Sequence, residues 1–479
     1  MRFSQWLYGT ARSSHAPQRN STYCGHDRTD FRNRHGLSGL DNIVTGRVKP
    51  LVSRRLHGSR AESESLALGS RVSVVIPNYN HTRFLRNAIR SVLDQTHHAF
   101  EIIVTDDGST DNCREVVAAF ADQVRYIWQD NRGLAEARNT GIRAAEGEWI
   151  ALLDADDEWR PRFLERMVTL AQESGASVAY CSAQAVDESG RELPQRFGGA
   201  VLRPERIRHT LLRANFIIPS TTLLRRSAID EVGLFDQSLR SCEDWDLWLR
   251  LLPKHMIVGT SECLVRYRLH GSSLSRNVLG MQQAVQAVVQ KHFGPDDGQY
   301  SIWPSDKRRA YGGVFRYHAL TSIQGHQNWL TGARYLKRAI QTDPTLAADL
   351  DLFYDLALGD QPFGYRGSLL QLDLLRNATQ TRSMLESVFR CPPLPRKDGL
   401  RRRAFGTAEA AIGLVAYNTG QLALSRRCLF VGLLYRPDLV KDGRIVGGLI
   451  KSILGRRLSD WLKKWSLAIK SSCCTHSTQ

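Results

Sequence analysis

Acidic side chains gather in three short clusters of this 479-residue chain, and a histidine follows them. Carboxylates that crowd together repel one another, and a divalent cation or a positively charged ligand among them relieves that repulsion. Mg²⁺ and Mn²⁺ take oxygen ligands and keep phosphate oxygens in their coordination shell. The pattern therefore indicates a site for a metal ion together with a diphosphate. The clusters are Asp106-Asp107-Gly108-Ser109, Asp154-Ala155-Asp156-Asp157 and Glu243-Asp244-Trp245-Asp246, and the histidine is His270 in YRLHGSSLS.

Each of these features also has a purely structural interpretation. DDGS is a common turn and helix-capping sequence, and an acidic EDWD suits the first turn of a helix because of the helix dipole. A D-x-D triplet often occurs by chance, and a lone histidine is more often structural than a ligand. The order of the clusters favours a site, because each follows an apolar strand or opens an amphipathic helix.

The elements around the clusters alternate between apolar runs and amphipathic segments from Arg71 onwards. This rhythm predicts an α/β fold with a Rossmann-like, mostly parallel sheet and helices on both faces. Ligands of such sheets bind at the carboxyl ends of the strands, where Asn78, Asp106, Asp107, Asp154, Asp156 and Asp157 all fall. The predicted strands are 72–77, 101–107, 124–129 and 148–159, and the predicted helices are 82–96, 110–120 and 133–145.

Six motifs in this order resemble the family 2 glycosyltransferases, which have the nucleotide-diphospho-sugar transferase (GT-A) fold. The resemblance covers roughly residues 71–276 and leaves both ends of the chain unaccounted for. It implies an inverting transfer of a sugar from a nucleotide-diphospho-sugar donor to a hydroxyl acceptor, with Mn²⁺ or Mg²⁺ as cofactor. The motifs are VSVVIPNYNHTRFLRNAIRSVLDQT, EIIVTDDGSTD, NRGLAEARNTGI, GEWIALLDADDEW, CEDWDLWLR and YRLHGSSLS.

The resemblance also implies a role for each motif residue in donor binding. Pro77 and Tyr79 would hold the nucleobase and ribose. Asp107 would hydrogen-bond the base with support from Asp106. Arg138 would approach the base or the diphosphate, and Asp154 would reach the ribose.

The same resemblance implies the residues of the reaction itself. Asp156 would ligate the metal ion that bridges the diphosphate, and His270 would be a further metal or phosphate contact. Asp244 would be the catalytic base, with Glu243 beside it as the alternative. Arg240 is a basic residue nearby that could assist the leaving diphosphate, but the sequence does not show where its side chain points.

The two ends of the chain carry its excess of positive charge. The net charge is +17. Residues 1–70 hold 11 basic against 5 acidic residues and 271–479 hold 29 against 15, whereas 71–270 hold 25 against 28. Basic flanks suit an anionic surface such as phospholipid headgroups, although solvated arginines on helices explain them equally well. We expect residues 1–70 to form a disordered basic extension.

After about residue 275 the pattern becomes all-helical. Segments 317–346 and 410–439 look alike, because each has a first helix, a turn that contains glycine (Gly325 or Gly420) and a second helix that ends at a proline (Pro344 or Pro437). They resemble tetratricopeptide hairpins, which predicts a helical domain over 277–479 with a surface for a protein partner. Residues 456–470 place Leu458, Trp461, Leu462, Trp465 and Ile469 on one apolar stripe flanked by basic residues, which suits either an anionic membrane surface or the end of the helical stack.

The sequence predicts a cytoplasmic enzyme. If residues 456–470 bind an anionic membrane, the enzyme would be a peripheral protein on the inner face of that membrane. No apolar stretch approaches the ~20 residues of a membrane span, the first residues lack a signal peptide, and nine scattered cysteines without a CxxC pair argue against zinc or disulfides. The predicted acceptor is a cell-envelope polysaccharide or a lipid-linked glycan. One alternative is a helical scaffold with a vestigial transferase domain. The other is a nucleic-acid binder, but the sequence has no RNA- or DNA-binding motif to support it.

Overall fold

The computed structural model describes residues 70–198, 202–271, 277–324, 326–359, 361, 369, 372–390 and 398–454. All of the predicted extension over residues 1–70 except Ser70 lies outside these ranges, as do the amphipathic segment 456–470 and Gly325. Within the described ranges, no helix combines the length and the apolarity that crossing a membrane requires.

Nine described strands form one sheet in the order β3-β2-β1-β4-β8-β6-β9-β5, with β7 paired to β6. The first four pair in parallel, which confirms the predicted α/β arrangement, and β6 and β9 are also parallel. β8, β5 and β7 join in antiparallel pairs, so the sheet is mixed. The strands are β1 (Val72–Asn78), β2 (Glu101–Asp106), β3 (Arg125–Trp128), β4 (Trp149–Leu152), β5 (Glu158–Trp159), β6 (Val178–Val186), β7 (Glu192–Phe197), β8 (Thr222–Arg225) and β9 (Ile257–Arg268).

Helices cover both faces of the sheet, as predicted. α2, α3 and α5 pack on one hydrophobic cluster of the sheet, and α4 packs on the other. Every residue of β1 is buried, as expected for a central parallel strand enclosed on both faces. The helices of this part are α2 (Thr82–Leu93), α3 (Cys113–Ala118), α4 (Leu134–Ala144), α5 (Phe163–Ser174), α6 (Pro204–Leu211), α7 (Arg226–Val232) and α8 (Glu243–Leu251), with a short 3₁₀ turn at η2 (Pro219–Thr221).

The predicted strand over 148–159 is wrong in its extent. β4 ends at Leu152, and Glu158–Trp159 instead form β5 beside β9. Between them the chain turns, with the backbone N–H of Asp157 donating to the carbonyl of Asp154 at 3.0 Å. The acidic side chains therefore occupy a turn and not a strand. The predicted helix 110–120 is shorter as well and begins at Cys113.

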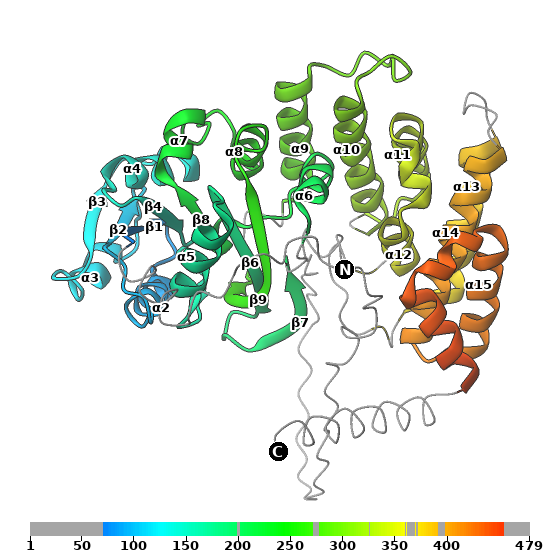
Figure 1. Ribbon diagram of the computed structural model, residues 1–479, viewed down its shortest axis with the longest axis horizontal. Helices are drawn as coiled ribbons and strands as arrows, with labels where there is room; N and C mark the ends of the chain where they lie inside the picture. The colour runs from blue at the N-terminus through cyan, green and yellow to red at the C-terminus, as the bar shows by residue number, and fades with distance from the viewer. Residues whose placement is uncertain are drawn as a thin grey trace, which may run out of the picture.

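The region after the sheet is all-helical, as predicted. Figure 1 shows its helices side by side at one end of the molecule, with α8 and α6 at the junction with the sheet. Pro344 and Pro437 each open a 3₁₀ turn after the second helix of a predicted hairpin. Their tetratricopeptide character remains a prediction. The elements are α9 (Val278–Phe293), α10 (Ser305–Gln324), α11 (Trp329–Thr342), η4 (Pro344–Ala348), α12 (Leu350–Leu358), α13 (Leu374–Arg390), α14 (Asp398–Asn418), α15 (Leu422–Tyr435) and η6 (Pro437–Lys441).

The contact between α10 and the segment after α6 leaves no room for a side chain at Gly313. A Cβ there would lie 1.9 Å from the carbonyl oxygen of Arg213. We expect Gly313→Ala to lower the free energy of unfolding by about 1–3 kcal/mol, the usual cost of overpacking, in urea titrations followed by circular dichroism.

Gly447→Ala is the matched control for this substitution. Gly447 is also helical, and a Cβ there would meet no atom within 4 Å. Because alanine favours helix over glycine, this variant should be as stable as the wild type or more stable by up to ~1 kcal/mol. Equal stability of Gly313→Ala and the wild type would contradict the close contact.

Candidate active site

The residues singled out in the sequence converge on the carboxyl ends of the parallel strands and on the first turn of α8. They come from six elements or the loops directly after them, so only the folded sheet brings them together. They are Pro77 and Tyr79 at β1, Asp106 and Asp107 at β2, Arg138 on α4, Asp154 and Asp156 after β4, Asp244 on α8 and His270 after β9.

Tyr79 and Pro77 are placed differently at the end of β1. Pro77 is buried within the strand and pairs in register with Thr105. Tyr79 follows the strand with 46% of its surface exposed, so its ring is accessible from solvent. Asn80 then adopts a left-handed backbone with φ of 56°, and its side-chain oxygen accepts a hydrogen bond from the backbone N–H of Thr110 at 2.8 Å. Tyr79 is therefore held on a fixed turn.

Asp106 and Asp107 are buried and shape the loop that follows β3. The carboxylate of Asp107 accepts hydrogen bonds from the backbone N–H groups of Arg132 and Gly133, at 2.9 and 2.8 Å. It also accepts one from the Gln129 side chain at 2.7 Å. Asp106 accepts hydrogen bonds from the Ser109 backbone and the Tyr126 hydroxyl. Both acids hold backbone in place, and their contact with a nucleobase remains a prediction.

Arg138 is the centre of a buried ion-pair network. It is 1% exposed. Its Nη2 contacts Asp154 Oδ1 at 2.6 Å and its Nη1 contacts Glu243 Oε1 at 2.5 Å. The guanidinium thus joins the end of β4 to the start of α8. This arrangement uses the carboxylate of Glu243 in an ion pair, whereas its neighbour Asp244 has no ion pair with a described residue within 4.0 Å.

Asp244 is a half-buried residue whose carboxyl group has a pKa near neutrality. Burial of the group raises the pKa of Asp244 to about 7, and the negative charge of Glu243 adds to the rise. Arg138 and a hydrogen bond from Asn215 act in the opposite direction. Asn215 Nδ2 donates to Asp244 Oδ2 at 2.7 Å. A carboxyl group with these properties can accept a proton at neutral pH.

His81, Asp156 and His270 bring three potential metal ligands together. Their ligand atoms all lie within 4.8 Å of one another. Asp156 Oδ2 lies 2.7 Å from His270 Nε2, and the rings of His81 and His270 have centroids 5.1 Å apart. Burial lowers the pKa of His81, although Asp156 raises it, which favours the neutral imidazole that binds metal. Two imidazoles and a carboxylate fit a divalent ion.

The three acids of the Asp154-Ala155-Asp156-Asp157 turn contact three different partners. Asp154 pairs with Arg138 and Asp156 with His270. Asp157 is buried and accepts a hydrogen bond from the backbone N–H of Arg268 at 2.9 Å. Burial, and then the charge of Asp156, raises the pKa of Asp157 well above its ordinary value. Asp157 thus fixes the end of β9, two residues before His270.

His81 and Asn215 are the residues that sequence reasoning missed. His81 directly follows the PNYN motif at the mouth of the sheet, and this position was the one available signal for it. Asn215 lies in RANF, outside every recognisable motif, so nothing in the sequence marked it. Arg240 is exposed and has no hydrogen bond or ion pair with any described residue, so it adds nothing to the network.

Comparison with known sequences shows which family the chain resembles. The sequence profile of "Glycosyl transferase family 2" matches residues 73–233. A putative teichuronic acid biosynthesis glycosyltransferase of Bacillus subtilis (strain 168) is 30% identical over 212 residues, which cover 43% of this chain and 82% of that protein. An uncharacterised glycosyltransferase of Escherichia coli (strain K12) is 32% identical over 241 residues, or 47% of this chain and 68% of that one.

Solved structures show only a distant likeness. A mannosyltransferase from Pyrobaculum calidifontis in complex with GDP-Man and Mn²⁺ has a TM-score of 0.41 and 16% identity, covering 80% of this chain and 87% of that one. S. aureus TarS 1–349 in complex with UDP-GlcNAc has a TM-score of 0.39 and 17% identity, covering 77% and 92%.

Proposed function

The chain belongs to glycosyl transferase family 2, and on this premise we propose that it transfers a sugar from a nucleotide-diphospho-sugar to a hydroxyl acceptor with inversion at the anomeric carbon. The observation that carries the proposal is the carboxyl group of Asp244, which accepts a hydrogen bond from Asn215, forms no ion pair with a described residue, and has a pKa that burial raises to about 7. Its neighbour Glu243 is held in an ion pair with Arg138, so we assign the proton transfer to Asp244.

The chemistry needs a base because a sugar hydroxyl is a poor nucleophile. In a single displacement, the acceptor oxygen bonds to the anomeric carbon while the bond from that carbon to the diphosphate oxygen breaks. Asp244 takes the proton of the acceptor hydroxyl as the new bond forms. Asn215 orients the carboxylate, and Arg138 keeps Glu243 from competing for the proton.

The donor is proposed to lie across the carboxyl ends of β1, β2 and β4. Tyr79 would stack on the nucleobase, and the loop shaped by Asp106 and Asp107 would border it. Asp154 and Arg138 would approach the ribose and the diphosphate.

The cofactor is proposed to be a divalent ion held by His81, Asp156 and His270. An ion bound there would offset the negative charge that develops on the departing nucleoside diphosphate. Mg²⁺ takes oxygen ligands, whereas imidazole suits transition-metal ions, so two imidazoles beside one carboxylate favour Mn²⁺ over Mg²⁺.

The proposed acceptor is a cell-envelope polysaccharide or a lipid-linked glycan. The name of the Bacillus subtilis relative, which refers to teichuronic acid biosynthesis, supports this class. We also propose three parts for the chain: a basic extension over 1–70, the transferase over 71–276 and a helical domain over 277–479. The helical domain would serve a protein partner, and the basic ends a peripheral contact with the inner face of the membrane.

Turnover should depend on the ionisation of Asp244. Because only the carboxylate accepts a proton, kcat/KM should rise with pH as Asp244 ionises and level off above a midpoint near 7. The measurement is nucleoside diphosphate release between pH 5 and 9 at saturating Mn²⁺. A profile that is flat down to pH 5 would mean that a carboxyl group with an ordinary pKa, or no carboxyl group, is the base.

Calorimetric titration with UDP and GDP tests the donor site before any acceptor is known. We expect one of these nucleotides to bind in the presence of Mn²⁺ and to lose most of its affinity in excess chelator. Metal-independent binding of RNA without nucleotide binding would instead support the nucleic-acid alternative.

A further inference from the structure

One segment of the transferase part, residues 211–217, lies between the helix that carries Asp244 and the all-helical region. It begins at the last residue of α6 and leads to η2. We propose that the helical region positions the catalytic base through this segment, with Arg213 and Asn215 as positioning residues for Asp244. The inference rests on the proposed role of Asp244 and extends it, because it makes the helical region a working part of the active site.

The first link is an ion-pair clamp on Arg213. Its Nη2 contacts Asp343 Oδ2 at 2.5 Å and the Thr345 hydroxyl at 2.8 Å, both where α11 gives way to η4. Its Nη1 lies 3.6 Å from Asp349 Oδ2, just before α12. The side chain of Asp343 is 7% exposed, so solvent screens this pair weakly. The carbonyl of Arg213 also abuts Gly313 on α10, so both its backbone and its side chain are held.

The second link runs from Arg213 to the base. Two residues further on, Asn215 Nδ2 donates to Asp244 Oδ2 at 2.7 Å. The side-chain oxygen of Asn215 accepts a hydrogen bond from the backbone N–H of Ile217 at 3.2 Å, which fixes the direction in which its amide points. The segment therefore presents a hydrogen-bond donor to Asp244 in one orientation.

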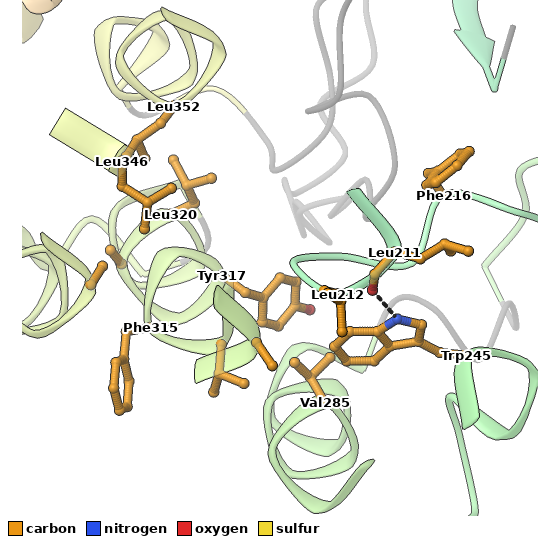
Figure 2. Close-up of a cluster of buried hydrophobic side chains, with 14 of the residues drawn as sticks. Leu211, Leu212, Phe216, Trp245, Val285, Phe315, Tyr317, Leu320, Leu346 and Leu352 are labelled. Atoms are coloured by element: carbon orange, nitrogen blue, oxygen red, sulfur yellow. Dashed lines mark hydrogen bonds between the residues drawn. The ribbon is translucent and has the colours of Figure 1, made fainter. Parts of the chain in front are cut away.

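Two tryptophans attach α8 to both ends of the same segment. Trp245 Nε1 donates to the Leu211 carbonyl at 2.7 Å, and Trp248 Nε1 donates to the Ile217 carbonyl at 3.1 Å. Figure 2 shows the first of these bonds, with Leu212 packed beside the Trp245 ring. Any shift of the segment is thus passed to the first turns of α8.

The helical region also contacts α8 directly, through polar interactions of Asp246 with α9. This carboxylate is fully buried and lies 2.7 Å from Lys291 Nζ and 2.9 Å from His292 Nε2, both on α9. Burial alone would raise the pKa of Asp246, but hydrogen bonds from His292 and Lys291 hold it well below its ordinary value. The charged carboxylate is therefore bound to α9 two residues after the proposed base.

Apolar packing makes the junction continuous. In Figure 2 the Trp245 ring lies beside Val285 of α9 and Tyr317 of α10, in one cluster that reaches Leu346 and Leu352. Because packed side chains transmit displacement, the helical region and α8 should move as one body.

The position of the proposed base, Asp244, and its affinity for a proton therefore depend on the ion-pair clamp on Arg213. Burial and the charge of Glu243 raise the pKa of Asp244, while Arg138, the Asn215 amide and the backbone N–H of Trp245 lower it. Of the groups that lower it, Asn215 is the one carried by the segment that Arg213 anchors to the helical region. If the clamp is broken, the carboxylate loses the hydrogen bond from Asn215, so its pKa should rise and its alignment with the acceptor should fail.

The test compares two arginines that cross the same junction. Arg213→Met breaks the clamp, and Arg208→Met breaks the ion pair between Arg208 on α6 and Asp306 on α10, neither of which belongs to residues 211–217 or hydrogen-bonds to Asp244. We expect Arg213→Met to lower kcat about 10- to 100-fold while leaving the donor KM within twofold. We expect it to shift the acidic limb of the pH profile to higher pH. Asn215→Ala should shift the limb in the same direction by about one pH unit. Arg208→Met should change none of these.

Two further measurements make the outcome decisive. Selective ¹³C labelling of aspartate carboxyl groups, with Asp244→Asn identifying the resonance, follows the same titration in the whole chain without turnover. Thermal unfolding shows whether each variant is folded. If Asp244→Asn is inactive while Arg213→Met and Asn215→Ala keep the wild-type kcat and titration, the positioning role is overturned and the proposed function stands. If Asp244→Asn keeps full activity, the proposed base itself is wrong.

Discussion

Replacing Asp244 with asparagine is expected to lower turnover by ~10²–10⁴ while leaving donor binding nearly intact. Asparagine has the shape of aspartate but accepts no proton from the acceptor hydroxyl. Donor binding should persist because the proposed nucleotide contacts, Tyr79, Asp154 and Arg138, are untouched. The measurement is nucleoside diphosphate release by the purified variant, beside calorimetric titration with the nucleotide.

Glu243→Gln is the informative companion to this variant. It removes the ion pair with Arg138 and keeps Asp244, so turnover should fall less than in Asp244→Asn. Wild-type turnover by Asp244→Asn would exclude it as the base. A loss confined to Glu243→Gln would transfer the role to the neighbouring residue.

Removing the proposed metal site is the second substitution with a large expected effect. Asp156→Ala deletes the one carboxylate of the cluster and leaves two imidazoles, so both Mn²⁺ binding and turnover should be lost. Excess chelator should do the same to the wild type, and His81→Ala should weaken Mn²⁺ binding as well. Electron paramagnetic resonance of added Mn²⁺ measures binding without turnover.

Asp122→Ala serves as the control for the metal-site variants, because Asp122 is an exposed acid outside the cluster. It should bind Mn²⁺ as the wild type does. Full activity of the wild type in excess chelator would show that His81, Asp156 and His270 have a structural role only.

The site illustrates which contacts a sequence pattern can predict. Asp156 and His270 lie 114 residues apart and were both predicted from family motifs, and the structure brings them to 2.7 Å. Arg138 was predicted near the donor, but its burial between two carboxylates could not be, because motif order does not say which acids face a given arginine. The same placement distinguishes the two neighbouring acids, because Arg138 forms an ion pair with Glu243 and none with Asp244.

The parts of the fold and the site that the sequence did not predict depend on contacts between distant residues, which leave no pattern in the local sequence. The parallel strands and the helical region follow from hydrophobic periodicity, which is a property of each segment alone. The split of 148–159 into two strands depends on the pairing of Glu158 and Trp159 with β9, more than 100 residues away. The Arg213 clamp likewise joins residues about 130 positions apart. Arg213 stands in none of the six family motifs.

The most direct test of the central claim is to follow donor consumption by the intact chain. UDP-GlcNAc, GDP-Man and other nucleotide-sugars are incubated with Mn²⁺ and candidate glycan acceptors, and ³¹P and ¹H NMR report the released nucleoside diphosphate and the configuration of the new linkage. We predict release from at least one donor, an inverted anomeric centre in the product and loss of both signals in Asp244→Asn. A folded protein that releases nucleoside diphosphate from none of these donors, or a product with retained configuration, would contradict the account.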